Sequence, residues 1–163
     1  MKRLVVACVI LLVPGCASFV DEGTSNDAIK ESTGLLVPEA SQIVADNFEL
    51  ISPNPRSVDI GEVKLGNGCR TDPNTLKSYG PPWTPHYQEV VLNPPSEFID
   101  RAVANIEAMT TRGFVRREGM PGEDPVGRVY TDSRGFTVYI ARDRTVRGEV
   151  EFTLFSSSPC AAE

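Results

Sequence analysis

Side chains that commonly build catalytic and metal sites are scarce in this chain of 163 residues. There is a single histidine, His86, and there are four cysteines. No G-x-S-x-G elbow and no histidines at zinc-binding spacing occur, so the common signatures of serine hydrolases and zinc proteins are missing. The phosphate-binding patterns G-x-x-x-x-G-K-S/T and G-x-G-x-x-G are missing too. We therefore expect no cofactor, no metal site and no enzymatic activity.

The chain also lacks an apolar run long enough to span a membrane. Its longest run, Leu4 to Val13, has ten residues. A helix of that length rises about 15 Å, which is half the thickness of a bilayer's hydrocarbon core. The run follows a short basic head, Met1-Lys2-Arg3. A basic head followed by a short apolar run is typical of an export signal.

The end of this run and the three residues after it carry a specific motif. Val13-Pro14-Gly15-Cys16 resembles the lipobox of bacterial lipoproteins, although Pro14 replaces the alanine, serine or threonine more usual at that position. The resemblance implies cleavage before Cys16 and a diacylglycerol on its thiol. Two acyl chains hold a protein stably on a membrane where one chain is marginal. Residues 1–15 are then a lipoprotein signal peptide, and the mature protein is lipid-anchored on the extracytoplasmic face of the cell membrane. The alternative is an ordinary secreted protein.

Basic residues are fewer than acidic ones. The formal net charge of −6 becomes −8 when Lys2 and Arg3 leave with the signal peptide. This charge argues against nucleic acid as a general partner. Ala17 to Thr111 holds 14 acidic and 6 basic residues, whereas Arg112 to Glu163 holds eight of each, and all eight basic residues there are arginine. Those arginines form either a solvated sheet face with ion pairs or a face that meets an anionic lipid or cell-wall polymer.

The mature chain divides into a polar tether, residues 16–37, and a single α+β domain, residues 38–163. Helices are predicted at Pro38–Ile51 and at Ser96–Arg112, because apolar residues recur on one face of each. Ser96 is the expected cap of the second helix, and Gly113 is expected to end it.

Alternating apolar and polar residues predict the strands. We expect an antiparallel sheet of about four to six strands, with one face on the two helices and the other in water. Residues 72–85 are expected to form a loop. The expected strands are His86–Leu92, Phe114–Glu118, Val126–Asp132, Gly135–Arg142 and Gly148–Phe155.

Two cysteines, Cys69 and Cys160, remain in the predicted domain. An even count outside the reducing cytoplasm favours a disulfide, and only this pairing is available. Two free thiols or a metal site are the alternatives, but supporting ligands are missing.

Three residues are candidates for contact with a partner. Trp83 lies in the string Tyr79 to Pro85, which forms either a recognition surface or a rigid loop that lays the indole over the core. Arg142 and Arg144 represent the arginine-bearing face. The order of lipobox, polar tether, helices and terminal strands resembles small actinobacterial lipoproteins of the LppA type, which implies an envelope location.

The leading hypothesis is a membrane-anchored envelope lipoprotein whose domain is a non-enzymatic binding or interaction module. Its partner would be an envelope protein or an anionic envelope polymer. The first alternative is a carrier that holds an apolar ligand between the helices and the sheet. The second is an envelope hydrolase that uses His86, although a lone histidine is far more often a surface or packing residue.

Overall fold

The structure, a computed structural model, describes residues 21–118 and 124–163. The predicted signal peptide and Cys16 lie outside the described residues. The helices are α1 Asn26–Ser32, α2 Val37–Ile51 and α3 Ser96–Ala108, with 3-10 turns η1 Ile60–Glu62 and η2 Met109–Arg112. The strands are β1 Gly68–Thr71, β2 Ser78–Trp83, β3 His86–Leu92, β4 Val115–Arg116, β5 Arg128–Thr131, β6 Thr137–Arg144 and β7 Val150–Ser157.

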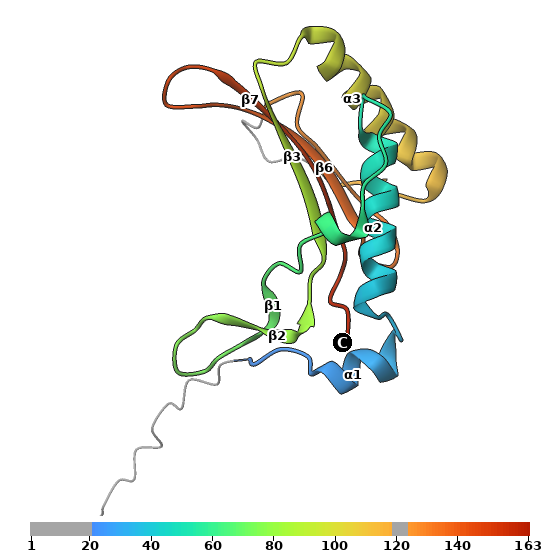
Figure 1. Ribbon diagram of the computed structural model, residues 1–163, viewed down its shortest axis with the longest axis vertical. Coiled ribbons are helices and arrows are strands. Elements are labelled where there is room, and N and C mark those ends of the chain that lie inside the picture. The colour runs from blue at the N-terminus through green and yellow to red at the C-terminus, as the bar shows by residue number, and fades with distance from the viewer. Residues whose placement is uncertain (1–20, 119–123) are drawn as a thin grey trace, which may run out of the picture.

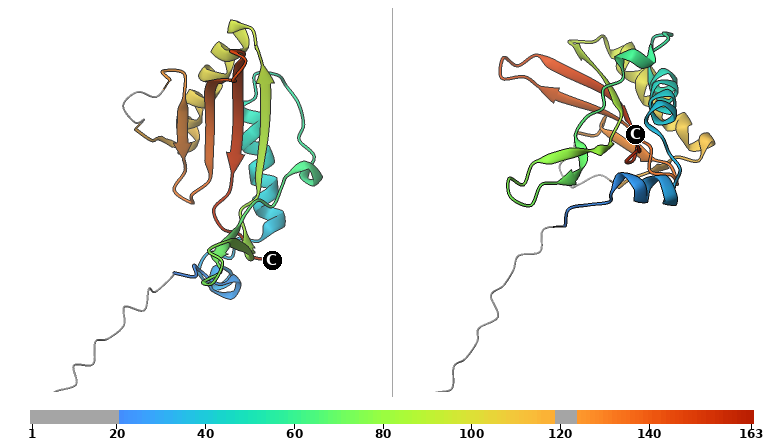
Figure 2. Two further views of the ribbon diagram at one scale, coloured as in Figure 1. Left: turned by 90° about the vertical axis from the view of Figure 1, so that its left-hand side faces the viewer. Right: turned by 60° about the horizontal axis from the view of Figure 1, so that its bottom comes forward.

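The predicted α+β class is confirmed. Strands β3 to β7 form a five-stranded antiparallel sheet in the order β3-β7-β6-β5-β4, and β1 and β2 form a separate pair. Helices α2 and α3 pack on the same face of the large sheet (Figure 1). The left view of Figure 2 looks onto the opposite face, with both helices behind the sheet. We call this helix-free side of β3 to β7 the open face.

The core lies between the two helices and the sheet. Side chains on one stripe of each helix meet the alternate side chains of β6 and β7 that point toward the helices. The largest of these side chains are less than 2% exposed; among them are Phe48, Ile51, Ile106, Val138, Ile140, Phe152 and Leu154. Apolar side chains of the protein itself therefore fill the layer that an apolar ligand would occupy, and the carrier hypothesis gains no support from the fold.

The ends of α3 agree only partly with expectation. The helix begins at Ser96, but Pro95 is its N-cap and no side chain makes a capping hydrogen bond, so the assignment of Ser96 as the cap is wrong. The α-helix ends at Ala108, earlier than predicted, and the 3-10 turn η2 continues the chain to Arg112. Gly113 follows as the predicted end, with a left-handed φ of 84°.

Helix α1 lies inside residues 16–37, the segment expected to be a tether. The Ser25 hydroxyl accepts a hydrogen bond from the Ala28 N–H, which caps the helix, and Ile29 is buried. Leu36 then forms a parallel bridge with Ala162 near the end of the chain. Ordered structure therefore begins before residue 38, because one apolar side chain in a polar stretch finds a tertiary contact.

The segment expected to be a loop, residues 72–85, contains strand β2. Thr71 pairs with Ser78, and Gly68 pairs with Trp83 across an irregularity in the register. Gly68 approaches the other strand so closely that a Cβ there would lie 1.7 Å from the Tyr79 carbonyl carbon. Two prolines in β2 cannot donate to a ladder, and this is why the sequence pattern did not indicate a strand.

The predicted disulfide is present. It joins Cys69 in β1 to Cys160 near the end of the chain, with their Cα atoms 6.1 Å apart. The backbones of Trp83 and Ala161 pair next to it, with N–H···O distances of 2.9 and 2.8 Å. The bond therefore attaches the small β1–β2 pair to the segment that follows β7.

Replacing both bonded cysteines with serine should lower the free energy of unfolding. The bond spans 91 residues, and the chain-entropy model assigns a loop of that length about 4–5 kcal/mol. Urea unfolding followed by circular dichroism measures the loss, and the unsubstituted protein under reducing conditions should show the same loss. An unchanged unfolding midpoint would contradict a stabilising bond.

Candidate functional site

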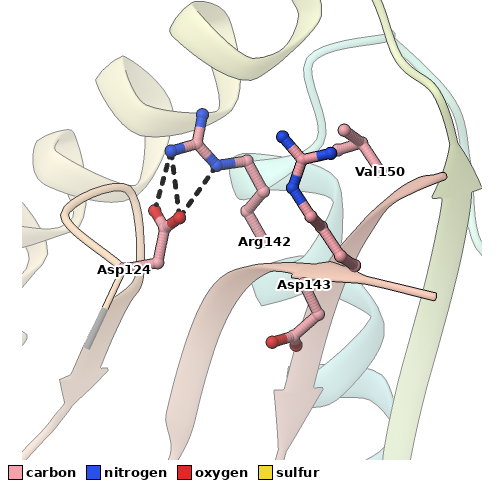
Figure 3. Close-up of a pocket in the computed structure, with 5 residues that line it drawn as sticks. Asp124, Arg142, Asp143 and Val150 are labelled. Atoms are coloured by element: carbon pink, nitrogen blue, oxygen red, sulfur yellow. Dashed lines mark hydrogen bonds and ion pairs between the residues drawn. The ribbon is translucent and has the colours of Figure 1, made fainter. Parts of the chain in front are cut away.

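Arg142 lies on the helix-facing side of β6, beyond the end of the core. It follows Ile140 by two residues and therefore shares its face. Its guanidinium donates two hydrogen bonds to the Asp124 carboxylate, from Nε to Oδ2 at 3.0 Å and from Nη2 to Oδ1 at 3.1 Å (Figure 3). The planar fork of arginine suits this two-pronged contact with a carboxylate. The Arg142–Asp124 pair therefore attaches the segment that precedes β5 to strand β6.

The environment of Asp124 holds its carboxyl in the charged form. Burial pushes the pKa of Asp124 upward, but the Val126 N–H and the guanidinium of Arg142 outweigh it, so the pKa is lowered. The Val126 nitrogen lies 2.8 Å from Oδ1 of Asp124. Because an arginine keeps its charge, the pair is ionic and neutral overall at physiological pH.

Arg144 and Arg142 line one shallow pocket of about 360 Å³ together with Asp124, Asp143 and Val150. The Nη1 group of Arg144 donates to the Gly148 carbonyl oxygen at 3.2 Å, within the β6–β7 connection. In Figure 3 the Asp143 side chain points away from Arg142. The pocket thus combines two arginines with two aspartates, so its charges balance. The role of Arg142 and Arg144 in binding a partner stays a prediction.

Trp83 is half-buried and has structural partners. A Cβ on Gly80 would lie 2.5 Å from the indole, so the ring covers that glycine. The indole Nε1 donates to Oε1 of Glu163 at 3.3 Å. Together with the backbone pairing to Ala161, these contacts hold Trp83 against β2 and the end of the chain. The residue therefore lies in a strand and not in the expected rigid loop, and its role in binding a partner stays a prediction.

The open face carries a row of rings that sequence reasoning did not identify. The imidazole of His86 stacks on Phe155 at 5.6 Å between ring centroids, and Phe155 stacks on Tyr139 at 4.7 Å. The planes in each pair differ by less than 25°, at 24° and 23°. These residues come from β3, β7 and β6, which are neighbours in the sheet. We call His86, Phe155 and Tyr139 the ring row.

Further apolar side chains share the open face with the ring row. Val90 is 44% exposed and Leu92 is 54% exposed, both on β3, and Val115 on β4 is 71% exposed. A residue on an antiparallel strand lies on the same face as its partner across the ladder, so the register places all of them on one side. The sequence held one indication of this surface: Tyr139 alternates with the buried residues of its strand and so occupies a position expected to face water.

His86 packs into the fold. A Cβ on Gly66 would lie 2.7 Å from Nδ1 of the ring, and Nδ1 lies 3.4 Å from the Thr84 carbonyl oxygen. With Asn67, Thr84, Phe155 and Ser157, it lines a shallow pocket of about 290 Å³. Within the described residues the ring has no hydrogen bond to a carboxylate that would orient it as a catalytic base.

Burial also affects the phenol of Tyr139. Desolvation by neighbouring atoms raises the pKa of Tyr139, and the nearby carboxylate of Asp143 raises it further. The hydroxyl therefore stays neutral and available as a hydrogen-bond donor at physiological pH.

Neither a metal centre nor a membrane span is found among residues 21–118 and 124–163. No group of three or more histidine, cysteine or acidic side chains in this part is placed to hold a metal ion. The helices described here are all too short or too polar to cross a bilayer. No family model, curated protein or solved structure matches the chain.

Replacing Arg142 with glutamine should make the protein more sensitive to acid. The pKa of Asp124 is lower in the folded protein than its unfolded value of 3.8, so the ionised carboxylate stabilises the fold at pH values above 3.8. This contribution is lost as the pH falls through the pKa of the folded state. Without the guanidinium the pKa of Asp124 in the folded state rises, so the variant loses this stabilisation at a higher pH than the unsubstituted protein does. At neutral pH the loss should be about 1 kcal/mol or less, because both side chains are partly exposed.

Acid unfolding followed by circular dichroism measures this shift, and a carboxyl NMR titration reports the pKa of Asp124 directly. Arg144→Gln is the matched control, because Arg144 donates to a backbone carbonyl. Equal acid midpoints for the two variants would contradict the assigned role of the Arg142–Asp124 pair.

Proposed function

We propose that this protein is a lipid-anchored, extracytoplasmic lipoprotein whose domain binds another envelope protein through its open face. The observation that carries the proposal is the ring row on a sheet face that no described helix covers. The domain acts as a non-enzymatic interaction module, and the lipid on Cys16 keeps it at the membrane surface.

The disulfide supports an extracytoplasmic location. Both cysteines of the described domain are used in one bond, and such bonds persist in oxidising compartments and are rare in the cytosol. The described chain begins beside β1, where Thr71 donates to the Glu22 carbonyl oxygen at 3.1 Å. Cys16 lies five residues before Asp21, a span of at most about 17 Å. The lipid would therefore hold the β1–β2 pair near the membrane.

The composition of the open face supports a contact surface. The outer face of a half-buried antiparallel sheet is ordinarily polar, because water covers it. Here it presents a phenol, a phenyl and an imidazole in one row, with Val90 and Leu92 nearby. Aromatic side chains with a polar tip are enriched at protein interfaces, since they bury a large area and still donate hydrogen bonds.

Charge favours a protein partner over an anionic polymer. The mature chain would carry a net charge of −8, which is the full-length −6 without Lys2 and Arg3. Asp143 and Glu151 are the acidic residues whose register places them on the open face. Several arginines are already neutralised in ion pairs, namely Arg56, Arg70, Arg128, Arg134 and Arg142. The register also places Lys64 and Arg117 on this side, so the argument against a polymer of phosphates or carboxylates is the net negative charge of the whole mature chain.

Substituting Cys16 tests the anchor. Cys16→Ala should move nearly all of the protein from the membrane fraction to the soluble fraction, or leave it unprocessed, because no thiol remains to carry the lipid. Fractionation with immunoblotting measures the distribution, and mass spectrometry of the amino-terminal peptide detects the acyl chains. Cys8→Ala is the matched control, since this cysteine lies in the discarded segment. Membrane retention of a processed Cys16→Ala chain would refute lipid anchoring.

Substituting the ring row tests the binding face. The double change Tyr139→Thr with Phe155→Thr should reduce partner recovery by tenfold or more, because central aromatic contacts contribute about 2 kcal/mol or more each. Crosslinking in intact cells with quantitative mass spectrometry measures the recovery, and circular dichroism checks the fold. Leu76→Thr is the control, because Leu76 is 68% exposed and lies outside the sheet. Unchanged recovery in the ring-row variant would contradict this placement.

A further inference from the structure

The two edges of the large sheet differ in their protection. At one edge β4 has only two residues, Val115 and Arg116, and Arg117 follows it. A short, charged edge is a common device against pairing with another chain. At the other edge β3 has seven residues, and its one acidic side chain, Glu89, is held by Arg56 at 3.1 Å. The long edge therefore lacks the protection of the short one.

The hydrogen bonds of β3 show which of its backbone groups point outward. His86 donates to the Lys64 carbonyl oxygen at 2.8 Å and accepts from the Lys64 N–H at 2.9 Å, on the side away from β7. Backbone groups alternate between the two sides of an antiparallel strand. The N–H and C=O groups of Gln88, Val90 and Leu92 therefore point away from β7. No backbone partner for these groups occurs in the described part of the chain.

Both ends of this free stretch are closed. Lys64 occupies the edge position at His86. At the other end Asn93 has a left-handed φ of 47° and Pro94 follows, so the chain leaves the strand direction. The unpaired edge is thus confined to residues 88–92. The side chains of Gln88, Val90 and Leu92 are exposed, with Val90 at 44% and Leu92 at 54%.

We infer that a second copy of this chain pairs with this edge, so that two β3 strands join antiparallel around a two-fold axis at Val90. Val90 then faces Val90 of the other copy, and Gln88 faces Leu92. These are the hydrogen-bonded pairs of the new ladder, in which facing residues exchange both N–H···O bonds. The two five-stranded sheets become one continuous sheet.

The edge is complementary to itself. An isologous contact places the same patch on both sides of the axis, so no residue may repel its own copy. Across this axis, valine meets valine and leucine meets the amide side chain of Gln88. On the helix-facing side Glu89 lies opposite Val91, so no like charges are opposed. An axis perpendicular to the sheet also turns both open faces the same way, which presents the two ring rows together.

Cysteine substitutions test both the contact and its register. Val90→Cys in the purified full chain should form a disulfide-linked dimer as the main species under mild oxidation, because facing Cα atoms in such a pair lie about 5.5 Å apart. Leu92→Cys alone should form no disulfide-linked dimer, because the two copies of residue 92 are about 13 Å apart along the strands. A mixture of Gln88→Cys and Leu92→Cys chains should crosslink. The unsubstituted chain is the control for crosslinks that form through Cys8 or Cys16.

Light scattering coupled to size exclusion tests the contact without crosslinking. The unsubstituted chain should have the mass of a dimer, Val90→Lys should be monomeric because it places two cations across the axis, and Val90→Thr should remain a dimer. A monomeric unsubstituted chain at every concentration tested would overturn the inference, as would equal crosslinking of Leu92→Cys and Val90→Cys. The dimer does not rest on the lipid anchor or the ring row, so the inference and the proposed function can fail separately.

Discussion

Packing of helices α2 and α3 on one face of the five-stranded sheet is the constraint from which the other features follow. Strand side chains alternate strictly between the two faces, so burying Phe152 and Leu154 against the helices forces Phe155 to the other side. The same alternation separates Ile140 from Tyr139. A slip of one residue in register would bury the ring row and expose the core, which is why both faces are specified together.

A second set of contacts closes the end of the domain where the described chain begins. Cys160 is bonded to Cys69, Ala161 pairs with Trp83, and Ala162 bridges to Leu36. These three consecutive residues follow β7, and they therefore connect the β1–β2 pair and the start of α2 to that strand. The β1–β2 pair contributes little to the main core, so covalent and backbone bonds replace apolar burial there.

Much of the fold was predictable, because the deciding patterns are local. A helical repeat of apolar residues indicated α2 and α3, and strand alternation indicated β3 with the bounds that the structure has. The disulfide followed from a count, since two cysteines allow one pairing. Helix α1 and the β1–β2 pair were missed because each is short, and its stability comes from residues distant in sequence, such as Ala162 and Cys160.

Periodicity and cysteine number can be evaluated without knowledge of spatial neighbours. They were therefore enough to predict the fold class, the main helices and strands, and the pairing of Cys69 with Cys160. The contacts of the polar and aromatic residues became visible only in the folded chain. It paired Arg142 with Asp124, 18 residues away, and it set His86 beside Phe155 and Tyr139. The reason is physical: charge pairing and ring stacking depend on strand order and register, and these are set by long-range packing of the whole sheet on its helices.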